Sequence, residues 1–263
     1  MDSLKRYGTT ALVTGASSGI GKSYAKAIAK DGLNLVLVAR RKNLLDELAA
    51  ELTAEYGIQV HTIAQDLTEM DAADKVYDNV QQAGLEIDLL VNNAGFGTHG
   101  VFGELDLERE LDMINLSCRL PVALTHKFIG GMQQRNRGAI VFLASMAGTM
   151  PIPFMSTYSA TKAFPMFFGE SLYGELAGTG IDVLAVAPGD TTTEFRETAD
   201  LDNAFPIPPR SPDDVVETTF NALGKKPSVI DGGANKMSAF VMGLLPKKLL
   251  LKNNAKLWKV TKN

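Results

Sequence analysis

Short runs rich in β-branched residues alternate with longer helical runs along this chain of 263 residues. The alternation is typical of a parallel β-sheet covered by helices on both faces, because parallel strands need long crossover connections. The strands are expected at residues 10–14, 35–39, 59–64, 88–91, 138–144, 182–187 and 228–230. Right-handed crossovers between them predict a doubly wound, mostly parallel, seven-stranded α/β sheet of the Rossmann type. No linker or tandem repeat interrupts the pattern, so residues 1–263 are expected to form a single domain.

Helices are expected at residues 19–30, 42–56, 104–114, 117–134 and 212–223. Another should begin after Thr68, because threonine is a common N-cap residue. A further helix should carry Tyr158, but Pro165 falls inside it and would remove a backbone hydrogen bond. We therefore expect that helix either to kink or to begin later than Tyr158.

A glycine-rich turn with the sequence TGASSGIG follows the first strand, at residues 14–21. Glycines allow a tight turn and a close approach of the backbone to a pyrophosphate, and the next helix points its N–H groups at that anion. A phosphate-donor P-loop is excluded, because it would need a glycine at position 16, where the chain has alanine. The residues of this turn that we expect to bind a nucleotide are Gly15, Ser17, Ser18, Gly19, Ile20 and Gly21.

The second strand ends at Ala39 and is followed by Arg40, Arg41 and Lys42. A carboxylate at this place would bind the ribose of NAD, whereas a guanidinium can hold the 2′-phosphate of NADP with two hydrogen bonds. Arg40 therefore predicts NADP, with NAD less favoured. The alternative is that these cations are the solvated start of the next helix.

Tyr158 and Lys162 are four residues apart, so on a helix they share one face. A nearby cation favours phenolate and makes the phenol usable for proton transfer. Ser145 ends the strand at residues 138–144 and would add a second hydroxyl. Reduction of a carbonyl builds negative charge on its oxygen, and two hydroxyls aimed at that oxygen stabilise the charge while one donates its proton. On its own, such a pair is most often a helix surface pair, so the rest of the chain must support a catalytic role.

From Thr10 to about Phe195, the motifs resemble those of the short-chain dehydrogenase/reductase family in order and spacing. They are residues 14–21, Asp66-Leu67, Asn92 to Gly95, Asn115, Ser145, Tyr158 with Lys162, and Pro188-Gly189 followed by Thr191 to Thr193. Residues 19–25 also resemble the branch of steroid dehydrogenases and long-chain ketoacyl-coenzyme A reductases.

The resemblance implies four catalytic residues. Tyr158 would be the proton donor in reduction and the base in oxidation, and Ser145 would hydrogen-bond the substrate oxygen. Lys162 would bind the nicotinamide ribose and lower the pKa of Tyr158, and Asn115 would hold a water that links Lys162 to solvent. Ser145 could instead be only a cap at the strand end, and Asn115 only a hydrogen-bonding residue within a helix.

The resemblance also implies cofactor contacts outside the glycine-rich turn. They are expected from Asp66, Leu67, Asn92, Ala94, Gly95, Tyr158, Lys162, Pro188, Gly189, Thr191 and Thr193. The threonines could instead belong to an ordinary loop.

On the substrate side, residues 190–210 are expected to form a lid. The substrate contacts that we expect are Ser145, Met146, Phe154, Tyr158 and Phe195. Apolar, methionine-rich walls suit an apolar ketone or aldehyde, although such side chains could also fill a core or an oligomer contact. The family resemblance further implies a homodimer or homotetramer.

Residues 236–263 form a basic tail. From Gly232 onward the chain has no acidic residue and seven lysines; since the whole chain carries −4, the preceding residues carry −11. If residues 247–262 are helical, Leu250, Leu251, Leu257 and Trp258 share one face. Such a helix could bind an anionic membrane peripherally, or a phosphate-bearing substrate, or it could pack on its own pocket or a partner subunit.

The composition limits other functions. The net charge of −4 argues against nucleic-acid binding, and three scattered histidines predict no metal site. A single cysteine, Cys118, allows no internal disulfide and fits a reducing compartment. The N-terminal residues predict no signal peptide, and no stretch reaches about 18 apolar residues, so a cytoplasmic protein is expected.

The leading hypothesis is an NADP-dependent oxidoreductase that interconverts a carbonyl and an alcohol on a small molecule. The alternative is a nicotinamide-nucleotide-binding sensor or scaffold without catalysis, but such a protein would be expected to lose part of the Asn, Ser, Tyr and Lys set. A sugar-nucleotide epimerase would usually need a longer chain after the sixth strand.

Overall fold

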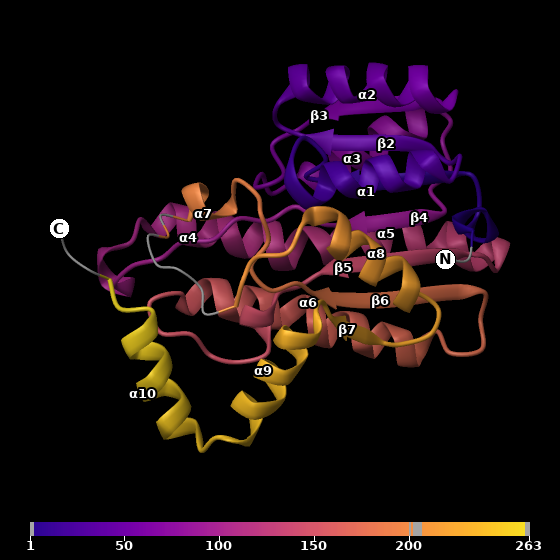
Figure 1. Ribbon diagram of the computed structural model, residues 1–263. Helices are drawn as coiled ribbons and strands as arrows, with labels where there is room; N and C mark the ends of the chain where they lie inside the picture. Colours follow the sequence, from indigo (N-terminus) through magenta and orange to yellow (C-terminus); the bar gives the residue numbers. More distant parts are fainter. Residues whose placement is uncertain (1–2, 200, 202–206, 261–263) are drawn as a thin grey trace.

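The computed structural model describes residues 3–199, 201 and 207–260, which form one α/β domain (Figure 1). Seven strands make one sheet in the order β3-β2-β1-β4-β5-β6-β7, and every neighbouring pair is parallel. The strands are β1 Thr10–Thr14, β2 Asn34–Ala39, β3 Val60–Ala64, β4 Leu89–Asn92, β5 Gly138–Leu143, β6 Ile181–Ala187 and β7 Ser228–Ile230. The doubly wound sheet predicted from the sequence is confirmed.

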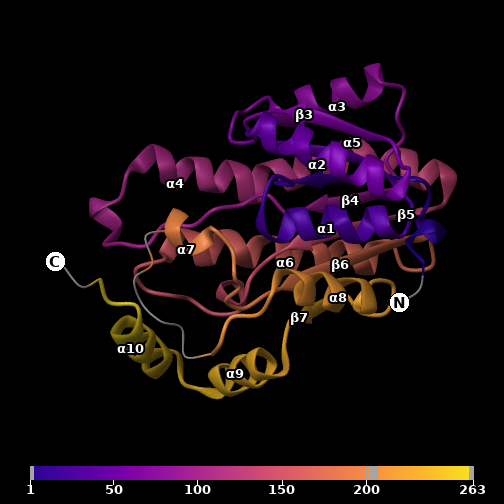
Figure 2. The same ribbon diagram turned by 45° about the horizontal axis from the view of Figure 1, so that its top comes forward.

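The helices are α1 Gly19–Lys30, α2 Lys42–Tyr56, α3 Ala72–Gln82, α4 Leu107–Ile114, α5 Leu120–Arg135, α6 Ser156–Glu175, α7 Phe195–Thr198, α8 Pro212–Ala222, α9 Gly233–Leu244 and α10 Lys247–Leu257. Alternate strand residues point to opposite faces of the sheet, so Val13 of β1 packs with α1, α2 and α8, while Leu12 packs with α3, α5 and the end of α6. Figure 2 shows the sheet between these helix layers.

The start of α3 differs from the prediction. Its N-cap is Asp71, not Thr68. The backbone N–H and the hydroxyl of Thr68 both donate to one carboxylate oxygen of Asp66, at 3.0 and 2.8 Å. Thr68 therefore closes a short turn after β3, and the helix begins three residues later than an N-cap at Thr68 suggested.

A π-helical turn, Asn115–Arg119, joins α4 directly to α5. The N–H of Leu120 donates to the carbonyl of Asn115, five residues back, which is the hydrogen bond of a π-helix. The two separate helices expected from the sequence are therefore one continuous helical segment. Such turns often mark functional sites, and this one contains the predicted catalytic residue Asn115.

Helix α6 begins at Ser156, two residues before Tyr158, and continues through Pro165 to Glu175. Since proline has no N–H, the carbonyl of Thr161 loses its usual helical donor. The Cys118 sulfur lies 3.9 Å from this oxygen and donates to it. The expectation that the helix might begin after Tyr158 is thus wrong, and the half-buried Cys118 has a packing role here.

The tail folds into two helices, of which only α10 was predicted. α9 and α10 extend from the body and meet at the turn around Pro246 (Figure 1). Leu250 and Asn254 are the buried residues of α10. Among the described residues, no helix is long and apolar enough to cross a membrane.

Candidate active site

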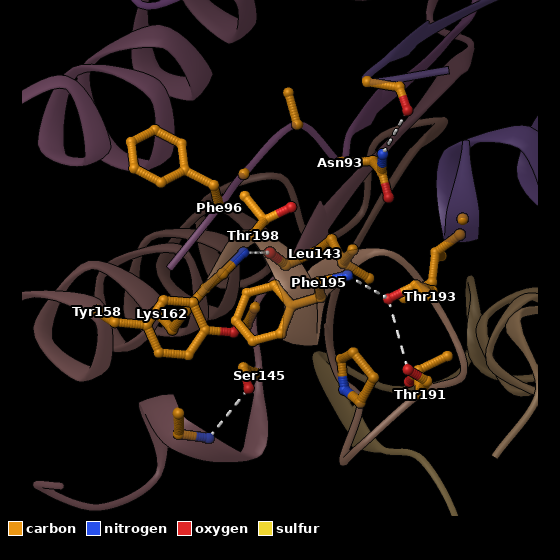
Figure 3. A pocket seen from close by; sticks show the side chains of 18 of the residues that line it. Asn93, Phe96, Leu143, Ser145, Tyr158, Lys162, Thr191, Thr193, Phe195 and Thr198 are labelled. Carbon is orange, nitrogen blue, oxygen red and sulfur yellow. Dashed lines mark hydrogen bonds between the residues drawn. The ribbon is translucent and has the colours of Figure 1, made fainter. Parts of the chain in front are cut away.

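A cavity of about 500 Å³ lies at the carboxyl ends of the strands. Residues that directly follow β1, β4, β5 and β6 line it, because parallel strands end at the same edge of the sheet. The glycine-rich turn forms one part of its wall, and Tyr158, Lys162 and Ser145 form another. Figure 3 shows the second part.

The glycine-rich turn is held tightly against the loop after β4. Gly15 has a φ of 67°, and a Cβ atom at Gly21 would lie 2.2 Å from the Gly15 carbonyl oxygen. The side chain of Asn93 donates to the carbonyls of Thr14, at 2.8 Å, and Gly15, at 3.4 Å. The N-terminus of α1 faces the same cavity, so these residues fit a dinucleotide pyrophosphate.

Two arginines after β2 line the cavity, and the structure gives them different roles. Arg41 donates to the hydroxyls of Ser17, at 3.2 Å, and Ser18, at 2.6 Å, and lies 3.1 Å from the carboxylate of Glu194. The Arg40 side chain is 71% exposed and approaches Asp66 at 3.9 Å. Arg41 is therefore the arginine that is fixed beside the glycine-rich turn.

Tyr158 and Lys162 share the inward face of α6, and both are buried. The ring of Phe195 covers Tyr158, with the ring centroids 5.2 Å apart (Figure 3). The Lys162 ammonium donates to the carbonyl of Leu143 at 3.0 Å. The hydroxyl of Ser145 accepts from the Ala147 N–H at 3.1 Å, which fixes its position at the end of β5.

Burial dominates the electrostatics of this pair. It raises the pKa of Tyr158 to about 12, and a hydrogen bond with Ser145 offsets part of that rise. Burial also lowers the pKa of Lys162 to about 8, against a small opposing effect of Cys118. The net shift of the Tyr158 pKa is upward because desolvation is its largest cause, and the lowering of this pKa by Lys162 stays a prediction. At neutral pH the phenol carries its proton.

Most of the predicted cofactor residues line the cavity: Gly15, Ser17, Ser18, Gly19, Ile20, Gly21, Arg40, Asp66, Leu67, Ala94, Gly95, Tyr158, Lys162, Pro188, Gly189, Thr191 and Thr193. Asn92 does not. It is the last residue of β4, it is buried, and neither polar atom of its amide has a hydrogen-bond partner among the described residues. The next residue, Asn93, lines the cavity in its place.

Of the predicted catalytic and substrate residues, Ser145, Met146, Tyr158, Lys162 and Phe195 line the cavity. Asn115 and Phe154 do not. The carbonyl of Asn115 accepts a hydrogen bond within the π-helical turn, and the next residue, Leu116, lines the cavity. Phe154 has a left-handed backbone, with φ of 67°, and the nearby residues Ile152 and Met155 line the cavity instead.

The sequence did not indicate that α9 lines the cavity, whereas packing of the α10 segment on its own pocket was one of the alternatives left open. Its lining includes Asn235, Ser238 and Met242 of α9, and Asn254, Leu257 and Trp258 at the end of α10. The spacing of these α9 residues, three and then four apart, places them on one face of a helix, and this was the signal in the sequence that they could line a common site.

Two hydrogen bonds fasten α10 over the cavity. The side chain of Asn254 donates to the carbonyl of Pro151 at 3.1 Å. A ring nitrogen of His99 lies 2.8 Å from the carbonyl of Trp258. Of the four apolar residues expected on one face, Leu250 is buried and Leu257 and Trp258 line the cavity, whereas Leu251 does not. Residues 261–263 of the tail, including Lys262, lie outside the described residues.

A family model described as short chain dehydrogenase matches residues 9–204. The chain belongs to the short-chain dehydrogenase family. This short-chain dehydrogenase is 32% identical over 237 residues to a 7β-hydroxysteroid dehydrogenase of Clostridium sardiniense, covering 90% of both chains. It is 33% identical over 257 residues to a very-long-chain 3-oxoacyl-CoA reductase of Anas platyrhynchos, covering 94% of this chain and 80% of that one.

Solved structures agree with this assignment. A 7β-hydroxysteroid dehydrogenase superposes with a TM-score of 0.89 at 28% identity, covering 97% of this chain and all of the other. A short-chain dehydrogenase of Sphingobium yanoikuyae, solved with NADPH, gives 0.78 at 33% identity, covering 91% and 97%. The short-chain dehydrogenase described here is therefore an NAD(P)-dependent oxidoreductase that acts on a carbonyl or an alcohol.

Proposed function

We propose that this enzyme is an NADP-dependent carbonyl reductase for an apolar ketone or aldehyde, with Tyr158 as the proton donor. One observation carries the proposal: Tyr158, Lys162 and Ser145 line the same cavity as the glycine-rich turn. The nicotinamide cofactor supplies the hydride when it is bound. The protein must then hold the carbonyl, stabilise its developing charge and deliver a proton.

Each of these tasks has a residue. The Ser145 hydroxyl, fixed by the Ala147 N–H, is placed to donate to the substrate oxygen. The Tyr158 phenol donates the proton, and the same group accepts it in the reverse direction. The Lys162 ammonium, held by the Leu143 carbonyl, is placed to bind a ribose hydroxyl. The role of Asn115 in holding a water stays a prediction.

The substrate end of the cavity is apolar. Beyond Tyr158, the lining includes Phe96, Met150, Ile152, Met155, Phe195, Met242, Leu257 and Trp258. Methionines adapt to irregular shapes, and a cavity of this size with few polar groups suits a bulky apolar carbonyl compound. The lid proposed at residues 190–210 contributes Phe195, Thr198 and Ile207; its residues 200 and 202–206 lie outside the described part of the chain.

The test of this function is absorbance at 340 nm with NADPH across a panel of ketones, aldehydes and acyl-coenzyme A thioesters. We expect reduction of bulky apolar carbonyls at neutral pH, because the raised pKa of Tyr158 keeps the donor protonated. Alcohol oxidation needs the phenolate, so its rate should rise as the pH increases from neutral to about 8, above which Lys162 loses the charge that binds the cofactor. Nucleotide binding without turnover on any compound of the panel would favour the sensor hypothesis instead.

We also propose that Glu194 competes with the 2′-phosphate of NADP. Its carboxylate lies 3.1 Å from both the Arg41 guanidinium and the Ser18 hydroxyl, so it holds an anion beside the glycine-rich turn. Burial of this pair is incomplete, so the competing interactions are worth roughly 1 kcal/mol. Glu194→Gln should therefore tighten NADPH binding about three- to tenfold, and NADH binding less.

Fluorescence titration of the two nucleotides measures this effect. Glu197→Gln is the matched control, because Glu197 is an exposed glutamate of the same segment that does not line the cavity. Equal tightening by both variants would mean that net charge alone acts, and weaker NADPH binding by Glu194→Gln would contradict the competition.

We propose that the outer face of α4, α5 and α6 binds a second copy of the chain. Leu111, Ile114, Val122, Phe164 and Phe167 are exposed there. Ile114, Val122 and Phe164 line a shallow groove on this face. An apolar face of this kind fits a homodimer or homotetramer. Light scattering that gives the mass of one 28.3 kDa chain would contradict it.

A further inference from the structure

An apolar stripe runs along the outside of α9. It consists of Met237, Phe240, Val241 and Leu244, which are 64, 65, 49 and 70% exposed. Their spacing of i, i+3, i+4 and i+7 is the pattern of a helix face that packs against another apolar surface. The described residues of the chain leave about half or more of each of these side chains exposed. An exposed apolar stripe of this kind indicates contact with another molecule.

The other side of the same helix belongs to the enzyme. Asn235 is buried, and it lines the cavity together with Ser238 and Met242. One face of α9 therefore lines the cavity and the opposite face lies on the outer surface of the protein. The first face has polar residues and a methionine, and the second is apolar. Figure 1 shows α9 and α10 extending away from the body, so the outer face of α9 is accessible to a large surface.

The charges of α9, α10 and the residues after them have one sign. Lys236, Lys247, Lys248, Lys252, Lys256 and Lys259 are all exposed on α9, α10 and the residues that follow. The segment from Gly232 to Asn263 contains no acidic residue. Exposed apolar side chains beside lysines are the composition of helices that lie at the surface of anionic membranes.

We propose that α9 and α10 dock this enzyme on an anionic lipid surface, with the stripe in the apolar boundary and the lysines at the headgroups. A second copy paired through the same stripe would bring the two sets of lysines together, and like charges oppose that arrangement. An anionic bilayer supplies both the apolar layer and the negative charge. The occupant that best complements this surface is therefore lipid.

This docking would bring the wall of the substrate cavity to the membrane. If the proposed reduction of apolar carbonyls is correct, a substrate dissolved in the bilayer would reach the cavity past α9 and α10 without crossing much water. This consequence rests on the proposed function, whereas the docking itself does not. The two can therefore fail separately.

The test is cosedimentation of the full chain with vesicles of phosphatidylcholine alone and of phosphatidylcholine mixed with phosphatidylserine. We expect binding that is at least tenfold stronger to the mixed vesicles and that falls as salt is added, because salt screens the lysines. Phe240→Ser with Leu244→Ser should lower binding at least tenfold. Met237→Ser should lower it less, and Met70→Ser, which changes an equally exposed methionine outside the tail, should leave it unchanged.

Each variant is first checked for NADPH binding and thermal unfolding, since none of the changed residues lines the cavity. Exchange of Lys248 and Lys252 for glutamine, which leaves the apolar stripe intact, should remove most of the preference for phosphatidylserine. Wild-type protein that does not pellet with the mixed vesicles would overturn the proposal. Equal pelleting of the wild type and the Phe240→Ser, Leu244→Ser variant would also overturn it. If that variant instead changed only the oligomer mass measured by light scattering, the stripe would be a contact with a second copy of the chain.

Discussion

Tyr158→Phe is expected to lower the turnover of carbonyl reduction by about a thousandfold, which lies within the range of general acid catalysis. The change removes only the hydroxyl, so the ring that packs against Phe195 at 5.2 Å stays in place. The proton would then have to come from water, and one of the two hydroxyls that stabilise the substrate oxygen would be lost. NADPH binding should change little, because the ammonium of Lys162 is held by the Leu143 carbonyl and not by the phenol.

Steady-state kinetics and nucleotide titration separate these effects. Tyr173→Phe is the matched control: it makes the same change on the same helix, at a half-buried residue that packs against the core and does not line the cavity. The control should retain wild-type turnover. If Tyr158→Phe kept more than about a tenth of the activity, Tyr158 would not be the main proton donor.

The second large effect is expected at Arg41. Arg41→Ala should raise the Michaelis constant for NADPH roughly ten- to a hundredfold, which corresponds to the loss of one charge-assisted contact. Two causes combine: the guanidinium no longer meets the 2′-phosphate, and the carboxylate of Glu194, 3.1 Å from Arg41 in the wild type, loses its cation and repels that phosphate. The constant for NADH, which has no 2′-phosphate, should change about threefold or less.

Arg40→Ala is the control that distinguishes the two arginines. The Arg40 side chain is 71% exposed, so its guanidinium has more solvation to lose when it binds a phosphate. We expect a smaller effect on NADPH than that of Arg41→Ala. Equal losses for NADH and NADPH in either variant would contradict a role in cofactor preference, and a larger effect at Arg40 would return the role to the residue expected from the sequence.

The sequence predicted the sheet well because five of its strands, β1, β2, β4, β5 and β6, are almost fully buried. Such strands are continuous apolar runs, which stand out from the helical pattern between them. β1 and β7 begin and end where they were expected, as do α1 and α2. The Tyr158 and Lys162 pair was also predictable, because a spacing of four on a helix fixes their shared face without any tertiary information.

Contacts between distant segments could not be predicted in this way. The arginine fixed beside the glycine-rich turn is Arg41, and it is selected by Ser17, Ser18 and Glu194, which approach it only in the folded chain. The raised pKa of Tyr158 likewise comes from the surroundings that bury it. Local spacing suggested a cation effect, but it contains no measure of desolvation.

The tail shows the same limit. Its lysines and leucines suggested one amphipathic helix, whereas the structure has two, and α9 was not expected. The bonds from Asn254 to Pro151 and from His99 to Trp258 join residues more than a hundred positions apart. Their pairing depends on where the sheet places the loops, which no local pattern records.

The two-sided character of α9 has a practical consequence for protein engineering. Residues that line the cavity and residues that face outward alternate along the twelve positions of this helix. A variant for use in homogeneous solution would need polar replacements only on the outward side, and a variant with altered selectivity only on the inward side. Behaviour in solution and substrate selectivity could then be optimised in separate variant libraries and combined afterwards.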